Sequence, residues 1–245
     1  MYNGLQLNVT RRFTSGLTFG AAYTLSKTED DGSTQRTVIP NAYDASMMWG
    51  PSNFDTRHMV MINYIYELPF FRTQTDFVGK VLGGWQASGI VTYNSGLPFT
   101  VVTSNFDPAG SGIINANPAG RPILLCNPNE NAPHTATQWF NTACFQANPA
   151  NTADTAALGF QNVFGDTPRG IVDGPPTHRV DFTMSKNVRI AETVRLQLRA
   201  EVFNIFNHTN FRGFTSLNNT GGANFGRIGT VRDPRTMQFG AKITF

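Results

Sequence analysis

The sequence lacks the charge of an ordinary soluble domain. Only 14% of its 245 residues are Asp, Glu, Lys or Arg, against about 25% in soluble domains. Hydrophobic residues, at 40%, do not fill the gap; the chain is instead rich in Gly (23), Pro (14) and Phe (20). Gly and Pro are poor helix formers, whereas aromatic residues suit strands. The composition therefore excludes a helical bundle or coiled coil.

Other signals are also absent. The net charge is only +3 and no basic run is longer than Arg11–Arg12, so the electrostatic footprint of a nucleic-acid-binding protein is missing. No run of about 18 apolar residues predicts a transmembrane helix. The first residues, MYNGLQLNVTRRF, contain no signal peptide and already alternate like a strand. We therefore expect the chain to be a piece of a longer protein.

Alternation of apolar and polar residues with a period of two predicts seven strands. In the first, Leu5 and Leu7 alternate with Gln6 and Asn8. The seven segments lie near residues 2–13, 17–27, 56–68, 85–95, 178–189, 193–206 and 236–245. Each is about 10 residues or longer, which exceeds the usual strand of a globular sheet but is enough for a tilted strand to cross a membrane.

The connections between these strands are alternately short and long. The long ones are polar or rich in Pro and Asn and occupy 28–55, 96–177 and 207–235. Antiparallel strands joined in this way place all short turns at one end and all long loops at the other, as in transmembrane barrels of the bacterial outer membrane. An irregular stretch as long as 96–177 also disfavours a compact soluble domain, although a further strand within it stays open.

Aromatic residues lie near the strand ends. Phe13, Tyr66 and Trp85 are near short turns, whereas Tyr93 and Phe99 are near a long loop. This placement fits the two aromatic girdles of a membrane barrel. The alternative is that aromatic residues are simply common in strands.

The last strand carries a pattern that resembles the C-terminal assembly signal of outer-membrane barrels. Apolar residues alternate up to an aromatic final residue, at Phe239, Ala241, Ile243 and Phe245. In that class of proteins the barrel assembly machinery reads this strand, and the strand closes the barrel.

Four further segments resemble TonB-dependent outer-membrane transporters, most closely the Oar-like group, whose members carry a carboxypeptidase-regulatory-like domain ahead of the plug. They are TVRLQLRAEVFNIFNHTNF at 193–211, WFNTACF at 139–145, Asp233-Pro234-Arg235 and Tyr2-Asn3-Gly4-Leu5-Gln6. Their order agrees with the family, and the NxFN and WFNTACF stretches are the specific parts.

The resemblance implies an all-β fold, in which about seven C-terminal strands form part of an antiparallel transmembrane barrel with long extracellular loops. The family barrel has about 22 strands around a plug domain. Neither a plug nor a TonB-interacting segment is visible here, and seven strands cannot close such a barrel, because edges facing lipid leave backbone groups unpaired. The implied partners are outer-membrane lipid, the rest of the barrel and its plug, the TonB complex through the missing N-terminal part, the barrel assembly machinery and an unknown extracellular substrate.

Cys126 and Cys144 both lie in the longest predicted loop. Two cysteines in an oxidising compartment favour a disulfide that pins the loop over a reactive site. A metal pair is disfavoured, since no CxxC or Cys/His cluster accompanies them.

The polar strand faces suggest a lumen. In a large barrel the inward face lines an aqueous space occupied by the plug. Seven charged residues are predicted to point there, at Arg57, Glu67, Asp181, Arg195, Arg199, Glu201 and Lys242. They would contact the plug or line the path that opens when it moves; alternatively, they only pair across strands and stabilise the sheet. In the outer loops, Tyr43, Trp139 and Phe140 are candidates for substrate contact.

No catalytic constellation is found, so we expect neither an enzyme nor a cofactor. The four histidines (His58, His134, His178 and His208) show no metal-binding spacing, and no GxSxG occurs. The sequence indicates part of a receptor that binds and imports a substrate across the outer membrane. Two alternatives remain: a small stand-alone barrel acting as adhesin or pore, and a secreted carbohydrate-binding β-sandwich.

Overall fold

The computed structural model describes residues 1–34, 44–71, 74, 76–103, 120–146, 165–191, 193–219 and 222–245. Its main feature is one antiparallel sheet of long strands in the order β1-β2-β4-β5-β10-β11-β14. The strands are β1 (Tyr2–Thr14), β2 (Leu17–Asp30), β4 (His58–Glu67), β5 (Trp85–Asn94), β10 (Thr177–Arg189), β11 (Arg195–Phe203) and β14 (Thr236–Thr244). Each long strand pairs with the next one along the chain, so the predicted antiparallel all-β fold is confirmed.

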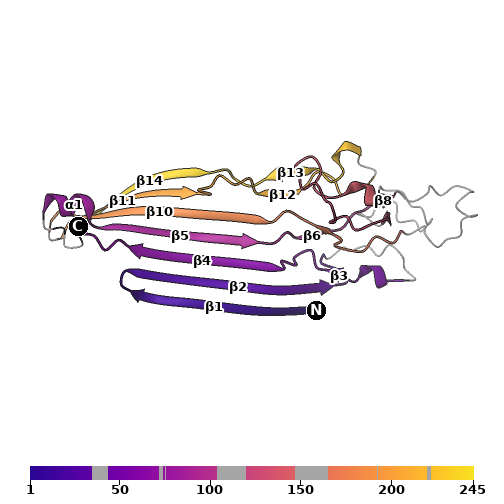
Figure 1. Ribbon diagram of the computed structural model, residues 1–245, viewed down its shortest axis with the longest axis horizontal. Coiled ribbons are helices and arrows are strands. Elements are labelled where there is room, and N and C mark those ends of the chain that lie inside the picture. Colours follow the sequence, from indigo (N-terminus) through magenta and orange to yellow (C-terminus); the bar gives the residue numbers. More distant parts are fainter. Residues whose placement is uncertain are drawn as a thin grey trace, which may run out of the picture.

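The two ends of the sheet differ. The short connections and the C-terminus lie at one end, and the long loops gather at the other (Figure 1). At the short-turn end, β1 and β2 are joined by Ser15 and Gly16, which both have positive φ (54° and 83°). Two such residues between paired Thr14 and Leu17 form the tight hairpin turn that matches strand twist.

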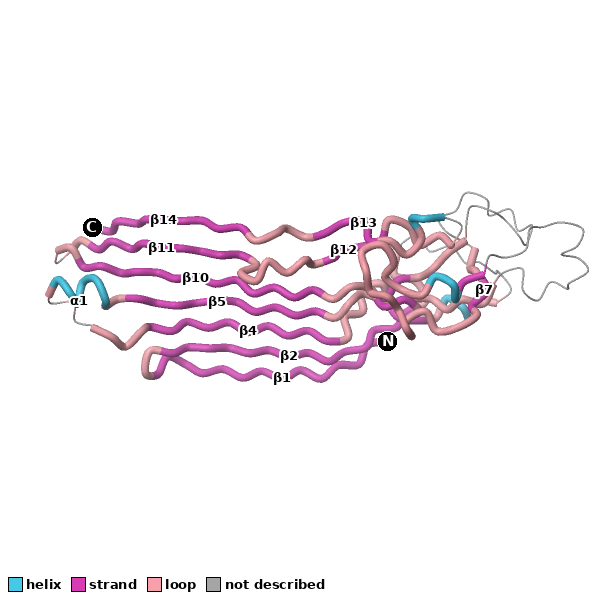
Figure 2. The backbone as a smooth tube through the Cα atoms, turned by 45° about the horizontal axis from the view of Figure 1, so that its top comes forward, coloured by secondary structure: helices cyan, strands magenta, loops and turns pink. Residues whose placement is uncertain are grey.

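Short elements occupy the stretches predicted as irregular loops (Figure 2). β3 (Gly50–Pro51) pairs with the last two residues of β2, while β6 with β9, β7 with β8, and β12 with β13 form small two-stranded sheets. These are β6 (Pro98–Phe99), β7 (Ile123–Leu124), β8 (Phe145–Gln146), β9 (Val172–Asp173), β12 (Phe211–Phe214) and β13 (Ile228–Val231). Short helices are η1 (Ser46–Met48), α1 (Phe77–Leu82), η2 (Thr142–Cys144) and η4 (Gly222–Asn224).

The predicted long loops therefore contain short strands and helices, and the ends of two predicted strands shift by three residues. β2 continues to Asp30, inside the predicted loop 28–55, because Glu29 and Asp30 pair with Pro51 and Gly50. β11 ends at Phe203 rather than at 206, because the next residue, Asn204, has φ 52° and turns the chain out of the sheet.

Strand register divides the sheet into two faces. Residues that pair across strands point to the same side, and following the pairs from β1 to β14 gives one continuous apolar face. This apolar face comprises Leu5, Leu7, Val9, Leu17, Phe19, Ala21, Tyr23, Val60, Ile62, Tyr64, Tyr66, Trp85, Ala87, Val91, Tyr93, Val180, Phe182, Met184, Val188, Leu196, Leu198, Ala200, Val202, Met237, Phe239, Ala241 and Ile243. Three cations share it: Arg11 and Lys186 toward the short turns, and Lys27 at the long-loop end, where its Nζ lies 2.7 Å from Glu29 Oε1.

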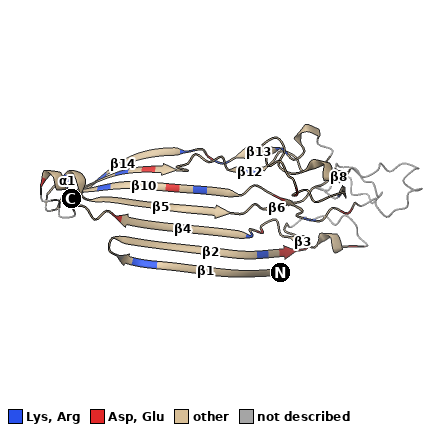
Figure 3. Ribbon diagram, in the orientation of Figure 1, with Lys and Arg blue, Asp and Glu red and all other residues tan. Residues whose placement is uncertain are grey.

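The opposite face is polar, with apolar exceptions such as Met61 and Ile90. This polar face comprises Gln6, Asn8, Thr10, Thr18, Thr24, Asn63, Glu67, Gln86, Ser88, Thr92, Asn94, Arg179, Asp181, Thr183, Ser185, Asn187, Arg189, Arg195, Gln197, Arg199, Glu201, Gln238, Lys242 and Thr244. Charged positions are sparse along the strands (Figure 3).

The hydrophobic core does not lie on the sheet. Side chains of the apolar face stay exposed, for example Leu7 (52%), Leu198 (46%) and Phe239 (83%). The buried apolar cluster is instead built by residues of the loop end, namely Val101, Trp139, Phe140, Cys144, Phe145, Val172 and Ile228. Among the described residues no second layer of long strands covers either face. No helix in this part of the chain combines the length and apolar character needed to cross a membrane.

The sheet is open at both edges. β1 and β14 are not paired with each other in the described chain. Each therefore leaves one row of backbone groups without a strand partner here, and an exposed edge of this kind is a template for pairing with another strand.

The close fit of Tyr64 over Gly89 offers a test of the sheet packing. A Cβ at Gly89 would lie 2.8 Å from Tyr64 Oη and 2.7 Å from the Asp181 carbonyl oxygen. We expect Gly89→Ala to lower the free energy of unfolding by about 1–3 kcal/mol through overpacking, measured by urea titration of the folded protein in detergent.

The control is Gly213→Ala, because a Cβ there meets no described atom within 4 Å. It should change the free energy of unfolding by less than about 0.5 kcal/mol. Equal stability of the two variants would contradict the packing described here.

Candidate functional site

Register places six of the seven predicted lumen residues on the polar face. They are Glu67, Asp181, Arg195, Arg199, Glu201 and Lys242. The seventh, Arg57, precedes β4 and lies at the long-loop end with its Nη2 3.7 Å from Asp55 Oδ2. The structure therefore brings the six together on one side of the sheet, while the assignment of that side to a lumen stays a prediction.

The ion pairs on this face run along strands. Arg199 Nη1 lies 3.3 Å from Glu201 Oε1, and Arg179 Nε lies 2.8 Å from Asp181 Oδ1. Both pairs join residues two apart on one strand, and in the described chain no ion pair links two neighbouring long strands. Across strands, Arg199 faces Ser185 and Gly240. Among the described residues, the ion pairs of this face therefore lie along strands, while Glu201 also accepts a cross-strand hydrogen bond from Gln238 Nε2.

Basic residues gather at the short-turn end of the polar face. Arg189 lies directly opposite Arg195, and Lys242 pairs with the nearby Gln197. The three basic side chains help to line an open cleft of about 470 Å³ together with Gln74 and Gln197. Like charges directly opposite each other destabilise a sheet, so this arrangement favours an anionic group in the cleft.

A second cleft, of about 450 Å³, opens at the long-loop end. Its lining includes Asp55, Arg57, Tyr93, Ser95 and Asp173. Asp55 is fixed by an N–H donated by Thr28 to its Oδ1 at 2.6 Å, and the Asp173 carbonyl accepts from Trp139 Nε1 at 2.9 Å. The carboxylates, the guanidinium and the Ser95 hydroxyl of this lining can bind a polar substrate by hydrogen bonds.

The long loops form a compact unit that we call the loop cap, comprising residues 98–103, 120–146, 165–174, 211–219 and 222–231. Phe140, fully buried, is at its centre, with its ring 5.7 Å from Phe145, 5.6 Å from Phe214 and 5.3 Å from Phe225 in edge-on contacts. Such contacts add to the burial of the rings. These contacts join the long loop before β10, which holds Phe140 and Phe145, to the long loop after β11, which holds Phe214 and Phe225.

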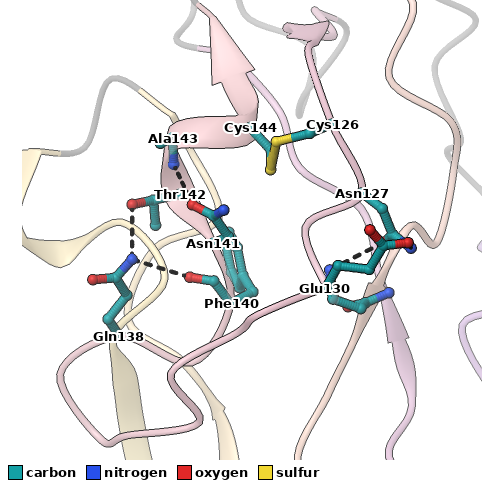
Figure 4. The surroundings of a disulfide bond; sticks show 10 residues. Cys126, Asn127, Glu130, Gln138, Phe140, Asn141, Thr142, Ala143 and Cys144 are labelled. Carbon is teal, nitrogen blue, oxygen red and sulfur yellow. Dashed lines mark hydrogen bonds between the residues drawn. A yellow bond between two sulfur atoms is a disulfide. The ribbon is translucent and has the colours of Figure 1, made fainter.

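A disulfide closes one part of the loop cap (Figure 4). Cys126 and Cys144, with Cα atoms 4.9 Å apart, are bonded across a sequence separation of 18. Neighbouring polar groups hold the segment: Asn141 Oδ1 accepts from the Ala143 N–H at 3.2 Å, and Gln138 Nε2 donates to the Phe140 carbonyl at 3.3 Å. Neither cysteine is a free thiol.

Burial overturns one expectation about these loops. Trp139 is 8% exposed and Phe140 is fully buried, so the interpretation of both as substrate contacts was wrong; they are core residues of the loop cap. Tyr43, the third candidate, lies outside the described residues.

A buried arginine ties the loop cap to the sheet. The Arg169 side chain, 4% exposed, places Nη1 2.5 Å from Asp30 Oδ1. Nη1 also donates to the carbonyls of Asp30 at 2.9 Å and Met48 at 3.2 Å, and Nη2 donates to Ser33 Oγ. A planar guanidinium can satisfy several acceptors in this way at once.

A second buried arginine lies nearby. Burial and the charge of Arg169 lower the pKa of Arg121 to about 10, which leaves it charged at neutral pH. Its Nε has no hydrogen-bond partner among the described residues. Sequence analysis missed both arginines, because they lie in the long stretch that showed no alternation.

The two asparagines of the NxFN motif, Asn204 and Asn207, have a structural role in a turn. Asn204 and Asn207 have left-handed backbones (φ 52° and 51°), a conformation that Asn tolerates well. Asn204 Oδ1 accepts from the His208 N–H at 3.0 Å, and Asn207 Oδ1 accepts from the Arg235 N–H at 3.0 Å. The motif therefore builds the turn that leaves β11 and returns toward β14.

The histidines are not all isolated. His178 and His208, distant in sequence, have ring centroids 5.2 Å apart, and Tyr23 Oη lies 2.9 Å from His58 Nδ1. In the described part of the chain no three potential metal ligands of the His, Cys, Asp or Glu type come together.

Comparison with known families agrees with this geometry. Residues 1–238 match the family described as outer membrane beta barrel domain. The chain belongs to this family, and the protein is located in the cell outer membrane. No curated protein matches the sequence. The family establishes an outer-membrane barrel in contact with lipid, so the alternative of a secreted β-sandwich is wrong.

Because Phe140 is at the centre of the loop cap, we expect that shortening its side chain loosens the loop cap alone. Phe140→Ala should destabilise the loop cap by about 3–5 kcal/mol because it leaves a cavity among three rings. The variant should fold into the membrane but be cut faster by protease within the loops.

Phe54→Ala is the matched control, since Phe54 is 72% exposed at the same end of the molecule. It should resist protease as the parent does. Unchanged resistance of the Phe140 variant would show that the rings do not hold the loops together.

Proposed function

We propose that this chain forms the C-terminal wall of a TonB-dependent transporter barrel of the Oar-like group, which binds a substrate outside the cell and imports it. The observation that carries the proposal is the open sheet: seven membrane-length strands with one apolar face and two unpaired edges. In hydrocarbon such edges need further strands. The NxFN and WFNTACF resemblances supply the choice of family.

In this proposal the long loops face the outside of the cell. Phe245 follows β14 at the short-turn end, which becomes the periplasmic side. The cleft beside Asp55, Arg57 and Tyr93 then opens outward, where it can receive a polar substrate such as a glycan or peptide.

The polar face lines the lumen. Its charges, including Arg195 and Lys242 in the basic cleft, contact the plug or line the path that opens when the plug moves. The along-strand pairing of Arg199 with Glu201 supports this role, because it keeps the Arg199 guanidinium on the polar face; Glu201 also accepts a hydrogen bond from Gln238 Nε2 of β14. No catalytic step is part of the proposal.

The proposed transporter also implies the remaining partners. Phe239, Ala241, Ile243 and Phe245 present the assembly signal to the barrel assembly machinery, and energy from TonB enters through a part of the transporter outside this chain. Outer-membrane lipid covers the apolar face.

Fractionation of source cells tests whether the barrel is larger than this chain. An antibody against residues 126–146 should detect, in the outer membrane, a band far above 26.9 kDa. A band near that mass in the same fraction would overturn the proposal in favour of a small stand-alone barrel that acts as adhesin or pore.

The assignment of the two faces is tested by adding one charge to each. Phe182→Lys puts a cation on the apolar face in the middle of β10 and should destabilise the folded protein by about 2–4 kcal/mol near the bilayer midplane. Thr183→Lys, one residue away on the polar face, should cost little. Folding into phospholipid vesicles, read by heat-modifiable migration on gels, measures both; a larger loss for the Thr183 variant would reverse the faces.

A further inference from the structure

Helix α1, in the short connection between β4 and β5, turns its apolar side outward. Phe77 is 81% exposed, Val78 48%, Val81 48% and Leu82 50%. At about 100° per residue these four side chains share one arc of about 140°. Gly79, on the opposite side, is buried. A helix that packs on a water-soluble body buries such an arc; here the arc is presented to the surroundings.

The helix is tied to the apolar face of the sheet. Lys186 of β10 lies on that face opposite Trp85 of β5. Its Nζ donates to the carbonyls of Val81, at 2.9 Å, and Gly83. Trp85 Nε1 donates to the Val81 carbonyl at 3.3 Å. Both side chains thus hold the C-terminal end of α1 on the side that the sheet turns to lipid, at the short-turn end (Figure 2).

The residues at this junction are those of a membrane interface. Trp85 and Lys186 are in contact, with Nζ 5.2 Å from the ring centroid. Trp is enriched where acyl chains meet headgroups, and Lys can keep its charge there while its stem covers apolar surface. Lys80, exposed beside the arc, adds a cation within reach of headgroup phosphates.

We propose that α1 is an interfacial anchor, whose Phe77, Val78, Val81 and Leu82 side chains insert between the headgroups and acyl chains of the leaflet at the short-turn end. This inference rests on the proposed lipid contact of the apolar face, to which Lys186 and Trp85 tie the C-terminal end of α1. The occupant is the phospholipid of that leaflet, the periplasmic one in the proposed orientation. The anchor fixes the depth of the barrel wall at the start of β5.

Site-specific fluorescence tests the anchor in the full protein, folded into vesicles of phosphatidylethanolamine and phosphatidylglycerol. The native cysteines are bonded to each other, so a single new thiol can be labelled with an environment-sensitive maleimide. Labels are placed at Phe77→Cys and, as a second position on the arc, Leu82→Cys. Lys80→Cys is the matched control on the same helix.

The labels at 77 and 82 should be quenched by phospholipids brominated near the headgroups more than by those brominated near the chain ends. They should resist aqueous iodide, which should quench the label at 80. Labels on the arc that iodide reaches as readily as it reaches residue 80 would overturn the anchor. Labels shielded from both quenchers would also overturn it, because the arc would then be covered by protein.

A label at Leu198→Cys separates failure of this inference from failure of the proposed function. If brominated lipid quenches the label at 198 but not those on the arc, the apolar face contacts lipid and only the anchor is wrong. If brominated lipid quenches none of them, the assignment of the apolar face to lipid fails as well.

Discussion

In hydrocarbon, a backbone N–H or C=O without a partner in the protein costs several kcal/mol, and the rest of this structure depends on that constraint. Antiparallel pairing satisfies it along the long strands, and pairing fixes the register. Register in turn puts Leu198 and Gln197 on opposite faces, so a one-residue slip would exchange the apolar and the polar side chains of a strand. Only the outer edges of β1 and β14 leave the constraint unmet within the described chain.

A second consequence is the division of the apolar residues between two environments. On the sheet they point outward and stay exposed, as Leu7 does, whereas in the loop cap they pack around Phe140. The buried Arg169 joins the two parts through Asp30 and Ser33. Loops that meet water need an ordinary core, while strands that meet lipid do not, because acyl chains solvate their apolar side chains.

Sequence analysis predicted the features that follow from the alternation of apolar and polar residues with a period of two. It located the seven long strands, their faces and the short turns, because each strand carries its own alternation. It missed contacts that join distant segments: the pairing of β2 with β3, the guanidinium of Arg169, and the burial of Trp139 and Phe140. The outward arc of α1 was also missed, since its six residues are too few to show a helical period. The disulfide could be anticipated from the placement of two cysteines, whereas its packing could not.

The separate core of the loop cap gives the protein two thermal behaviours. A large positive heat-capacity change accompanies the exposure of apolar surface to water, and in this fold the apolar surface hidden from water by other side chains is that of the loop cap around Phe140 and Val101. The stability of the loop cap must therefore curve with temperature as that of a small soluble domain does, while the sheet is held by hydrogen bonds and lipid. A single melting temperature does not describe such a molecule.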